Sequence, residues 1–293
     1  MTRKIRTIVV LAATAAVWAA SNASVGTQGS APLSRMMVNG GEIEYETRGT
    51  TGEPVLLIHG TGVAATFAPT MSQPSLAGYR LIRYHRRGFG GSGRAPVPFS
   101  NKDQAADARA LLNALGISRA HIVGHSTGGM ITLQFALDYP SVARSIVIIE
   151  PPIFNPDAPT SPFAQLVATY NSGDKIGAMS TFSQMSYGPE WRTLASRVPG
   201  GPSQVEHDVD TVFQSEVPAM TSWRFGPAEG ARILQPAIYL TGGGRHGGSL
   251  KQLKTWISGL DSAIVPGTTH AMLMEDPKGV AEAIAAFLRR NPF

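Results

Sequence analysis

The pentapeptide Gly124-His125-Ser126-Thr127-Gly128 places a serine between two glycines, after an apolar strand pattern and before a helical one. Glycine has no Cβ, so this spacing permits a sharp strand-to-helix turn that leaves the central hydroxyl exposed at the end of a sheet. A serine in that position becomes a nucleophile when a base accepts its proton. The pattern predicts Ser126 as a nucleophile, with the N–H of Thr127 as one donor to a developing oxyanion.

Two other patterns resemble ligand-binding motifs but lack the surrounding context. Residues 88–93 match the spacing GxGxxG, yet Pro96 and Pro98 follow where a dinucleotide-binding helix would have to begin. His121 and His125 are four residues apart, but they fall on a strand pattern and the turn that ends it, so they share no helical face as zinc ligands would. The predicted chemistry therefore needs no metal and no cofactor.

Strand and helix patterns alternate from residue 36 onward. Asn39-Gly40-Gly41 is a turn signal between two short strands and indicates a hairpin, and Asp276 followed by Pro277 marks the start of a last helix. Further strands are expected at 55–60, 79–86, 121–126, 145–150, 237–242 and 262–267, and helices at 101–117 and 128–139. This alternation favours an α/β fold, with a mostly parallel central sheet between layers of helices.

Residues 152–230 interrupt this alternation. The stretch is rich in Pro, Gly and Ser and has no apolar strand run, but it contains nine scattered aromatic residues, which disordered linkers rarely do. It is therefore predicted to be a helical cap inserted between two parts of the core, residues 36–151 and 231–293. Its aromatic and methionine side chains exceed the needs of a small private core, and Trp191 and Trp223 are expected to bind substrate in an apolar pocket.

Residues 1–23 have the features of a secretory signal peptide. The segment begins with the basic stretch MTRKIR, continues with an apolar run of 14 residues, and ends with the small residues Ser21-Asn22-Ala23. The run is shorter than the ~20 residues that a membrane-spanning helix needs, so no stable membrane anchor is expected. The pattern predicts a secreted or periplasmic protein whose residues 24–35 form a linker.

Composition excludes several classes of protein. Of the 293 residues, 43% are hydrophobic and 15% charged, which predicts one sizeable folded core. Three of the 25 basic residues lie in the leader, so the remaining chain carries a net charge of only +2 and shows no basic cluster with interleaved aromatics. No nucleic-acid partner is therefore expected. The chain has no cysteine, which excludes disulfide bonds and a thiol nucleophile.

Five segments in order, GGEIEYETRG, VLLIHG, RRGFGGSG, GHSTGG and PGTTHAMLMEDP, resemble the α/β-hydrolase family from about residue 38 to the C-terminus. The resemblance implies the α/β-hydrolase fold with an inserted helical cap. It also implies that His270, after the last strand, is the general base. The second oxyanion donor would come from the turn His59-Gly60-Thr61-Gly62, with Thr61 as the first candidate and Gly60 as the alternative. The His59 ring is expected to shape this turn rather than to carry a proton.

The acid that would complete a catalytic triad with Ser126 and His270 has an unusual position in the sequence. In most members of the family that this chain resembles, the acid follows the penultimate strand, but here the segment GGGRHGGSLKQLK contains neither Asp nor Glu. Asp261 precedes the last strand and so belongs to the opposite edge of the sheet. A minority of the family carries the acid after the strand that follows the nucleophile's helix, and that position is Glu150. Glu150 is therefore predicted to orient His270 and to stabilise its protonated form.

The resemblance implies an enzyme in which Ser126 attacks a carbonyl, His270 transfers the proton, and water releases the acyl group. Charged residues are few in 152–230, so the expected substrate is a neutral, largely apolar carboxylic ester or lactone of small to medium size, aromatic esters included. Haloalkane dehalogenases and epoxide hydrolases share the fold but use a carboxylate nucleophile, and Ser126 argues against both. A carbon–carbon bond hydrolase and a cofactor-free haloperoxidase-like enzyme stay open as alternatives. A non-catalytic ligand-binding protein fits less well, because all three triad positions are filled.

Overall fold

The computed structural model describes residues 33–94, 98–155, 157, 158, 160–243 and 248–293. The predicted signal peptide and most of the predicted linker therefore lie outside the described residues, and so does part of the glycine-rich segment after residue 243. Within the described ranges, no helix combines the length and the apolar character needed to cross a membrane.

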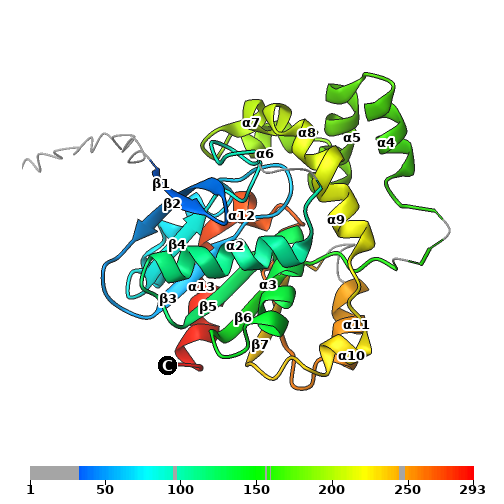
Figure 1. The fold of residues 1–293 in the computed structure, drawn as a ribbon. Helices are drawn as coiled ribbons and strands as arrows, with labels where there is room; N and C mark the ends of the chain where they lie inside the picture. The colour runs from blue at the N-terminus through cyan, green and yellow to red at the C-terminus, as the bar shows by residue number, and fades with distance from the viewer. Residues whose placement is uncertain (1–32, 95–97, 156, 159, 244–247) are drawn as a thin grey trace, which may run out of the picture. The chain divides into compact units, whose positions relative to one another are not determined.

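The eight strands form one sheet with the order β1-β2-β4-β3-β5-β6-β7-β8 (Figure 1). β1 pairs antiparallel with β2 and β2 with β4, and every later pair is parallel. The strands are β1 (Ser34–Val38), β2 (Gly41–Arg48), β3 (Pro54–Ile58), β4 (Arg80–Tyr84), β5 (Ala120–His125), β6 (Ala143–Ile149), β7 (Ala237–Thr241) and β8 (Asp261–Ile264). The predicted fold class is confirmed, as are the hairpin and the strands expected from the β-branched runs.

The turn between β1 and β2 has a backbone conformation that requires a sequence such as Asn39-Gly40. Val38 pairs with Gly41, so only Asn39 and Gly40 form the loop, and both have positive φ (49° and 80°). A two-residue loop with two positive φ angles matches the right-handed twist of the strands, and Asn-Gly adopts it most readily.

Helices cover both faces of the sheet (Figure 1). Those of the core are α1 (Ala68–Met71), the 3₁₀ helix η1 (Pro74–Leu76), α2 (Asn101–Ala114), α3 (Thr127–Asp138), α11 (Gly248–Trp256), α12 (Met272–Glu275) and α13 (Pro277–Arg289). Helix α2 begins with a capping box between Ser100 and Asp103, and α13 begins with Asp276 as its cap and Pro277 in its first turn, as predicted.

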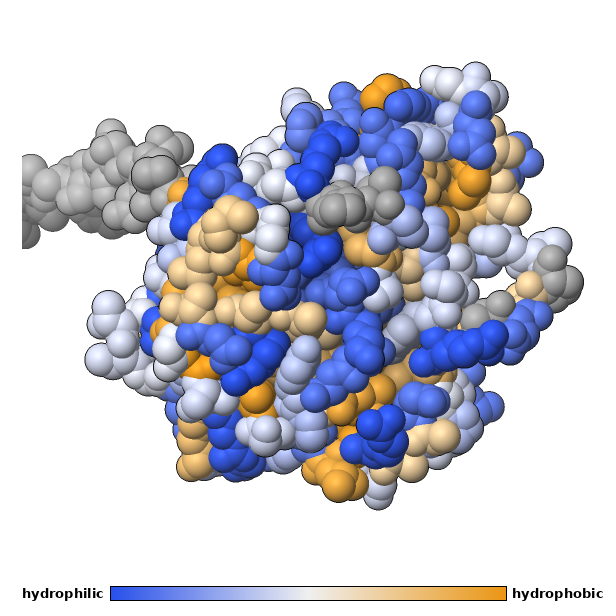
Figure 2. All heavy atoms as spheres, viewed as in Figure 1, coloured by the Kyte–Doolittle hydropathy of each residue, from blue (hydrophilic) through white to orange (hydrophobic). Residues whose placement is uncertain are grey.

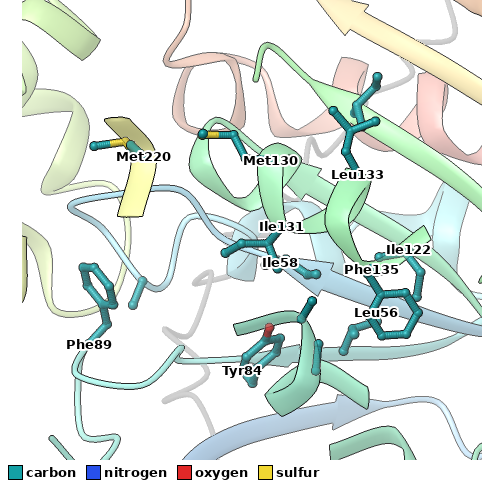
Figure 3. Close-up of a cluster of buried hydrophobic side chains, with 14 of the residues drawn as sticks. Leu56, Ile58, Tyr84, Phe89, Ile122, Met130, Ile131, Leu133, Phe135 and Met220 are labelled. Atoms are coloured by element: carbon teal, nitrogen blue, oxygen red, sulfur yellow. The ribbon is translucent and has the colours of Figure 1, made fainter. Parts of the chain in front are cut away.

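Side chains that alternate along the strands separate the interior into two apolar clusters. Leu56 and Ile58 belong to one cluster and Val55 and Leu57 to the other, because successive residues of a strand point to opposite faces. Figure 3 shows part of the first cluster, in which Leu56 and Ile58 lie close to side chains of α3. Both faces of the central strands β3, β5, β6 and β7 are therefore buried, which explains their nearly continuous apolar sequences.

All described elements between β6 and β7 are helical. They are α4 (Ala164–Asn171), α5 (Lys175–Tyr187), α6 (Trp191–Ala195), α7 (Gly201–His207), α8 (Val209–Thr211), the π-helical segment η2 (Val212–Glu216), α9 (Val217–Ser222) and α10 (Pro227–Gly230). Helices α4 to α9 lie together at one side of the sheet, whereas α10 lies beside the core helix α11 (Figure 1). We call residues 152–230 the cap. On the face seen in Figure 2, hydrophilic and hydrophobic residues are mixed, with hydrophobic ones visible among the cap helices.

Candidate active site

Ser126 occupies a sharp turn between β5 and α3. Its backbone has φ 53° and ψ −121°, a conformation that non-glycine residues rarely adopt and that stores strain at functional sites. The flanking glycines make the turn possible: a Cβ on Gly124 would lie 2.0 Å from the carbonyl oxygen of Gly128, and one on Gly128 would lie 2.1 Å from that of Ile58. The predicted strand–turn–helix context of the serine is therefore present.

His270 and Glu150 meet beside this turn. The His270 Nδ1 atom lies 2.9 Å from Glu150 Oε2, and both side chains are buried, with 5% and 2% of each residue exposed. His270 belongs to the loop between β8 and α12, whereas Glu150 directly follows β6 and has a positive φ of 44°. The sheet thus brings together two residues that are 120 positions apart in the sequence.

The other carboxylate oxygen of Glu150 is held by the end of β7. The Thr241 hydroxyl donates to Oε1 at 2.7 Å and the Gly242 N–H donates to the same atom at 3.0 Å. Burial by itself raises the pKa of Glu150, but the hydrogen bonds from His270 and Thr241 outweigh burial and lower that pKa to about 2. Glu150 is therefore a carboxylate over the whole range in which an ester hydrolase works.

The two alternative positions for an acid are not available. Asp261 is the first residue of β8, where it is exposed and pairs with Arg290 at 2.9 Å. Gly242 occupies the position after β7, and a Cβ there would lie 2.4 Å from the Thr268 carbonyl oxygen. Gly242 begins the segment in which most of the family was expected to carry the acid, and its N–H instead donates to Glu150.

The turn at residues 59–62 lies against the nucleophile. A Cβ on Gly60 would be 2.9 Å from the Ser126 Cβ, so only glycine allows this approach. The hydroxyl oxygens of Thr61 and Thr127 are 2.6 Å apart, which ties this turn to the start of α3. Among the described residues, neither the Thr61 nor the Thr127 backbone N–H is used in a hydrogen bond. Both predicted oxyanion donors are thus adjacent to Ser126 and have N–H groups to offer.

His59 holds the turn in shape, as expected. Its Nδ1 atom lies 2.6 Å from the Gly60 carbonyl oxygen, and its Nε2 atom accepts the Arg86 backbone N–H at 3.0 Å. Burial, together with the nearby Arg86 charge, lowers the pKa of His59 well below its usual value. A neutral ring engaged at both nitrogens links two loops and does not act as a proton carrier.

Ser126, Glu150 and His270 line a single pocket of about 310 Å³. The rest of its wall is mainly apolar and comes from the segment after Glu150 and from cap helices: Pro151, Pro152, Ile153, Phe154, Pro162, Phe163, Phe182, Met185 and Met220, with Thr127, Ser186 and Ser249 as polar members. Among the described residues, no Lys or Arg lines the pocket. The described contacts include no hydrogen bond between Ser126 Oγ and the His270 ring. Such catalytic bonds often tighten only when substrate binds.

The structure does not place Trp191 or Trp223 in this pocket. Trp191 is 2% exposed, with the Arg192 guanidinium over its ring, and Trp223 stacks on Phe225 while its indole N–H donates to Gln134 of α3 at 2.8 Å. The expectation that they bind substrate is corrected, because both rings are buried apart from the described lining of the pocket. The rings that line the pocket belong to phenylalanines of the cap.

Sequence reasoning missed three buried polar residues around the Thr61 turn. Arg86 and Glu216 form an ion pair at 2.6 Å with 1% and 0% of their side chains exposed, and the Tyr187 hydroxyl donates to the Thr61 carbonyl oxygen at 2.8 Å. One signal was present for Glu216: like Glu150, it is a lone carboxylate inside an apolar stretch, VFQSEVPAM. Nothing local pointed to Tyr187.

The pKa of Glu150 predicts how stability depends on pH. A carboxyl whose pKa is about 2 in the folded chain and 4.5 in the unfolded chain stabilises the fold above pH 4.5, and this contribution is lost as the pH falls through 2. The free energy of unfolding should therefore fall more steeply below pH 4.5 in the wild type than in Glu150→Gln. Urea denaturation at pH 5 and pH 3 measures both slopes, and equal slopes would contradict the hydrogen-bonded carboxylate.

A strained serine, a buried His–Glu pair and two adjacent N–H donors lie together at one end of a mostly parallel sheet, an arrangement typical of hydrolases that use a serine nucleophile. Residues 53–202, just over half of the chain, match the alpha/beta hydrolase fold family. The chain belongs to this family.

Two curated proteins share part of the sequence with this chain. The chain is 39% identical over 110 residues to a putative carbamate hydrolase RutD of Variovorax paradoxus (strain S110), a match that covers 36% of this chain and 41% of that protein. It is 37% identical over 112 residues to a 2-hydroxy-6-oxononadienedioate/2-hydroxy-6-oxononatrienedioate hydrolase of Burkholderia vietnamiensis (strain G4 / LMG 22486), covering 36% of this chain and 39% of that protein. The chain thus spans about two fifths of the curated relatives that it matches.

A solved structure matches over a longer stretch. The enol-lactonase from Burkholderia xenovorans LB400 superposes with a TM-score of 0.73 at 17% identity, covering 87% of this chain and 100% of that one. This likeness concerns the fold.

Proposed function

We propose that this protein is an exported serine hydrolase that cleaves neutral, largely apolar carboxylic esters or lactones through an acyl-enzyme on Ser126. The observation that carries the proposal is the pocket itself, in which Ser126, Glu150 and His270 share a wall with phenylalanine, methionine and proline side chains. A site of this size and polarity fits a small apolar molecule with one reactive carbonyl.

The roles of the residues follow from their positions. His270 accepts the Ser126 proton through Nε2 while Nδ1–H donates to Glu150, so the carboxylate fixes the tautomer and stabilises the imidazolium. Ser126 attacks the carbonyl carbon, and the N–H groups of Thr61 and Thr127 stabilise the oxyanion. His270 then protonates the leaving alcohol, and water, deprotonated by His270, releases the acid.

The charge of the substrate distinguishes this proposal from the alternative, which is carbon–carbon bond hydrolysis of an anionic substrate. The relative from Burkholderia vietnamiensis is named for dioate substrates, which carry two carboxylates. Holding such groups calls for cationic donors, and the described lining residues include neither Lys nor Arg. The sequence identity to the carbamate hydrolase covers only 36% of this chain. We therefore do not extend the substrate in that protein's name to the pocket of this chain.

A substrate panel tests the proposal. p-Nitrophenyl esters of increasing acyl length, aromatic esters and a set of lactones should be hydrolysed by the wild type and not by Ser126→Ala. Matched esters with a carboxylate on the acyl chain should be far poorer substrates. Activity confined to the charged esters would refute the apolar pocket, and no turnover of any ester or lactone would refute the hydrolase.

Substitutions in the cap distinguish the pocket from the cap interior. Phe182→Ala removes a pocket ring that also packs on Phe163, so it should raise KM for aromatic esters by roughly 10-fold or more and change KM for an acetate little. Trp191→Ala should leave this selectivity unchanged but destabilise the fold by about 3–5 kcal/mol. Steady-state kinetics and urea denaturation measure both effects, and a reversed pattern would contradict the pocket assignment.

Export belongs to the same proposal and rests on the N-terminal sequence. Mature protein recovered from the producing cell should begin at Ser24, after the small residues Ser21-Asn22-Ala23. Mass spectrometry that finds Met1 retained on the active protein would contradict it.

A further inference from the structure

The cap holds the predicted oxyanion residue Thr61 by its backbone carbonyl and by its side-chain hydroxyl. Tyr187, the last residue of α5, donates its hydroxyl to the Thr61 carbonyl oxygen at 2.8 Å. Glu216, at the end of the π-helical segment η2, accepts the Thr61 hydroxyl at 3.0 Å through Oε1. Both hydrogen bonds cross from residues 152–230 to the core turn that faces Ser126.

The contact continues to the second oxyanion residue. Because a carboxylate accepts only, Thr61 Oγ1 donates to Glu216, and the Thr127 hydroxyl, 2.6 Å away, then serves as donor to Thr61 Oγ1. The three side chains form a buried chain of hydrogen bonds from α3 through the Thr61 turn to the cap. The two residues predicted to donate their N–H groups to the oxyanion are thus fixed to each other and to one carboxylate.

A lone carboxylate here would disfavour the oxyanion, but the charge of Glu216 is neutralised. Arg86 binds it with two hydrogen bonds, Nη2 to Oε1 at 2.6 Å and Nη1 to Oε2 at 3.0 Å, and Gln104 donates to Oε2 at 3.3 Å. Bidentate pairing fixes the plane of the carboxylate as well as its charge. π-Helical segments such as η2 are rare in proteins, and those that occur are often found at functional sites.

We propose that Glu216 and Tyr187 are positioning residues for the oxyanion hole, so that the hole reaches its active geometry only when the cap is docked on the core. The proposal rests on the proposed function, because it assigns the cap a share in transition-state stabilisation by Thr61 and Thr127. Removal of one oxyanion donor costs about 10²–10³ in kcat. Loss of one positioning contact should cost a fraction of that, roughly 10-fold.

Two conservative substitutions test the proposal. Thr61→Val removes the bonds to Glu216 and Thr127, and Tyr187→Phe removes the bond to the Thr61 carbonyl while keeping the ring that stacks on His270. For each variant, kcat and KM are measured on one p-nitrophenyl ester, together with Ki for a trifluoromethyl ketone of matched chain length. That ketone forms an adduct with the serine whose oxyanion occupies the hole, so it reports on transition-state binding.

A matched control comes from the same cap. Tyr170 is also a buried cap tyrosine, and its hydroxyl donates to Asp210 at 2.7 Å, away from the pocket wall. Tyr170→Phe should leave kcat and Ki within about twofold of the wild type. Thr61→Ser, which keeps the hydroxyl, should recover most of the activity lost in Thr61→Val.

The expected result is a roughly 10-fold fall in kcat in Thr61→Val and in Tyr187→Phe, a rise in Ki by the same factor, and little change in KM. Folded variants whose kcat and Ki equal those of the wild type, or whose loss appears only in KM, would overturn the inference. Loss of active protein without a change in Ki would also overturn it, because the role would then be structural. A wild type that neither hydrolyses esters nor binds the ketone would instead refute the proposed function.

Discussion

Glu150→Gln should lower kcat by about 10³–10⁴ while the protein stays folded. The amide keeps the shape of the side chain, but it cannot stabilise the imidazolium and it can favour the wrong tautomer of His270, whose Nδ1 lies 2.9 Å from the carboxylate. KM should change much less, because Glu150 acts through His270 rather than on the ground-state substrate. Steady-state kinetics with a p-nitrophenyl ester give both constants, and circular dichroism checks the fold.

Asp261→Asn is the matched control for this substitution. It neutralises the other candidate carboxylate, which lies at the far end of β8 beside Arg290 and has an exposed side chain. Its kcat should stay close to that of the wild type. A crippled Asp261→Asn beside a nearly normal Glu150→Gln would mean that the acid has been assigned to the wrong strand.

Arg86→Met should produce a large loss of stability, about 3–5 kcal/mol in the free energy of unfolding. The substitution leaves the fully buried Glu216 carboxylate without its cation. It also removes an ion pair between the core, which contains Arg86, and the cap, which contains Glu216. The double variant Arg86→Met/Glu216→Leu should regain part of the loss, because no buried charge is then left unpaired. Urea denaturation of Arg86→Met, Glu216→Leu, the double variant and the wild type gives the four free energies of unfolding that this comparison needs.

The exposed pair of Arg35 and Glu42 supplies the comparison. Its side chains are 52% and 42% exposed, so solvent screens the pair and Arg35→Met should change the free energy of unfolding far less than Arg86→Met does. Equal losses in the two variants would contradict the view that burial makes the Arg86–Glu216 pair critical.

Local sequence patterns predicted the elements and most of the catalytic constellation. Strands such as β6 were recognisable because parallel strands buried on both faces need unbroken apolar runs, and Ser126 because its turn tolerates only glycine at positions 124 and 128. Glu150 was predicted from the family resemblance, because the segment after the penultimate strand offered no acid and a minority of the family carries the acid after the strand that follows the nucleophile's helix. Each of these inferences depends on residues that are close in sequence or fixed by strand order.

The sequence did not predict which side chains of the cap line the pocket, and the reason is physical. Its helices are short, and the choice between pocket and interior for Trp191 or Phe182 depends on packing between helices that no local pattern encodes. The contacts of Glu216 and Tyr187 with Thr61 join residues more than 120 positions apart. Only the folded arrangement shows that a cap carboxylate, an arginine after β4 and a threonine beside the nucleophile form one buried network.

Covalent labelling by a fluorophosphonate, with the modified residue identified by peptide mass spectrometry, tests the central claim most directly. The folded wild type should be labelled stoichiometrically on Ser126, Ser126→Ala should not react, and Glu150→Gln should react much more slowly than Asp261→Asn. Labelling at another residue, or no labelling of folded wild-type protein, would contradict the assignment of Ser126 as a nucleophile activated by His270 and Glu150.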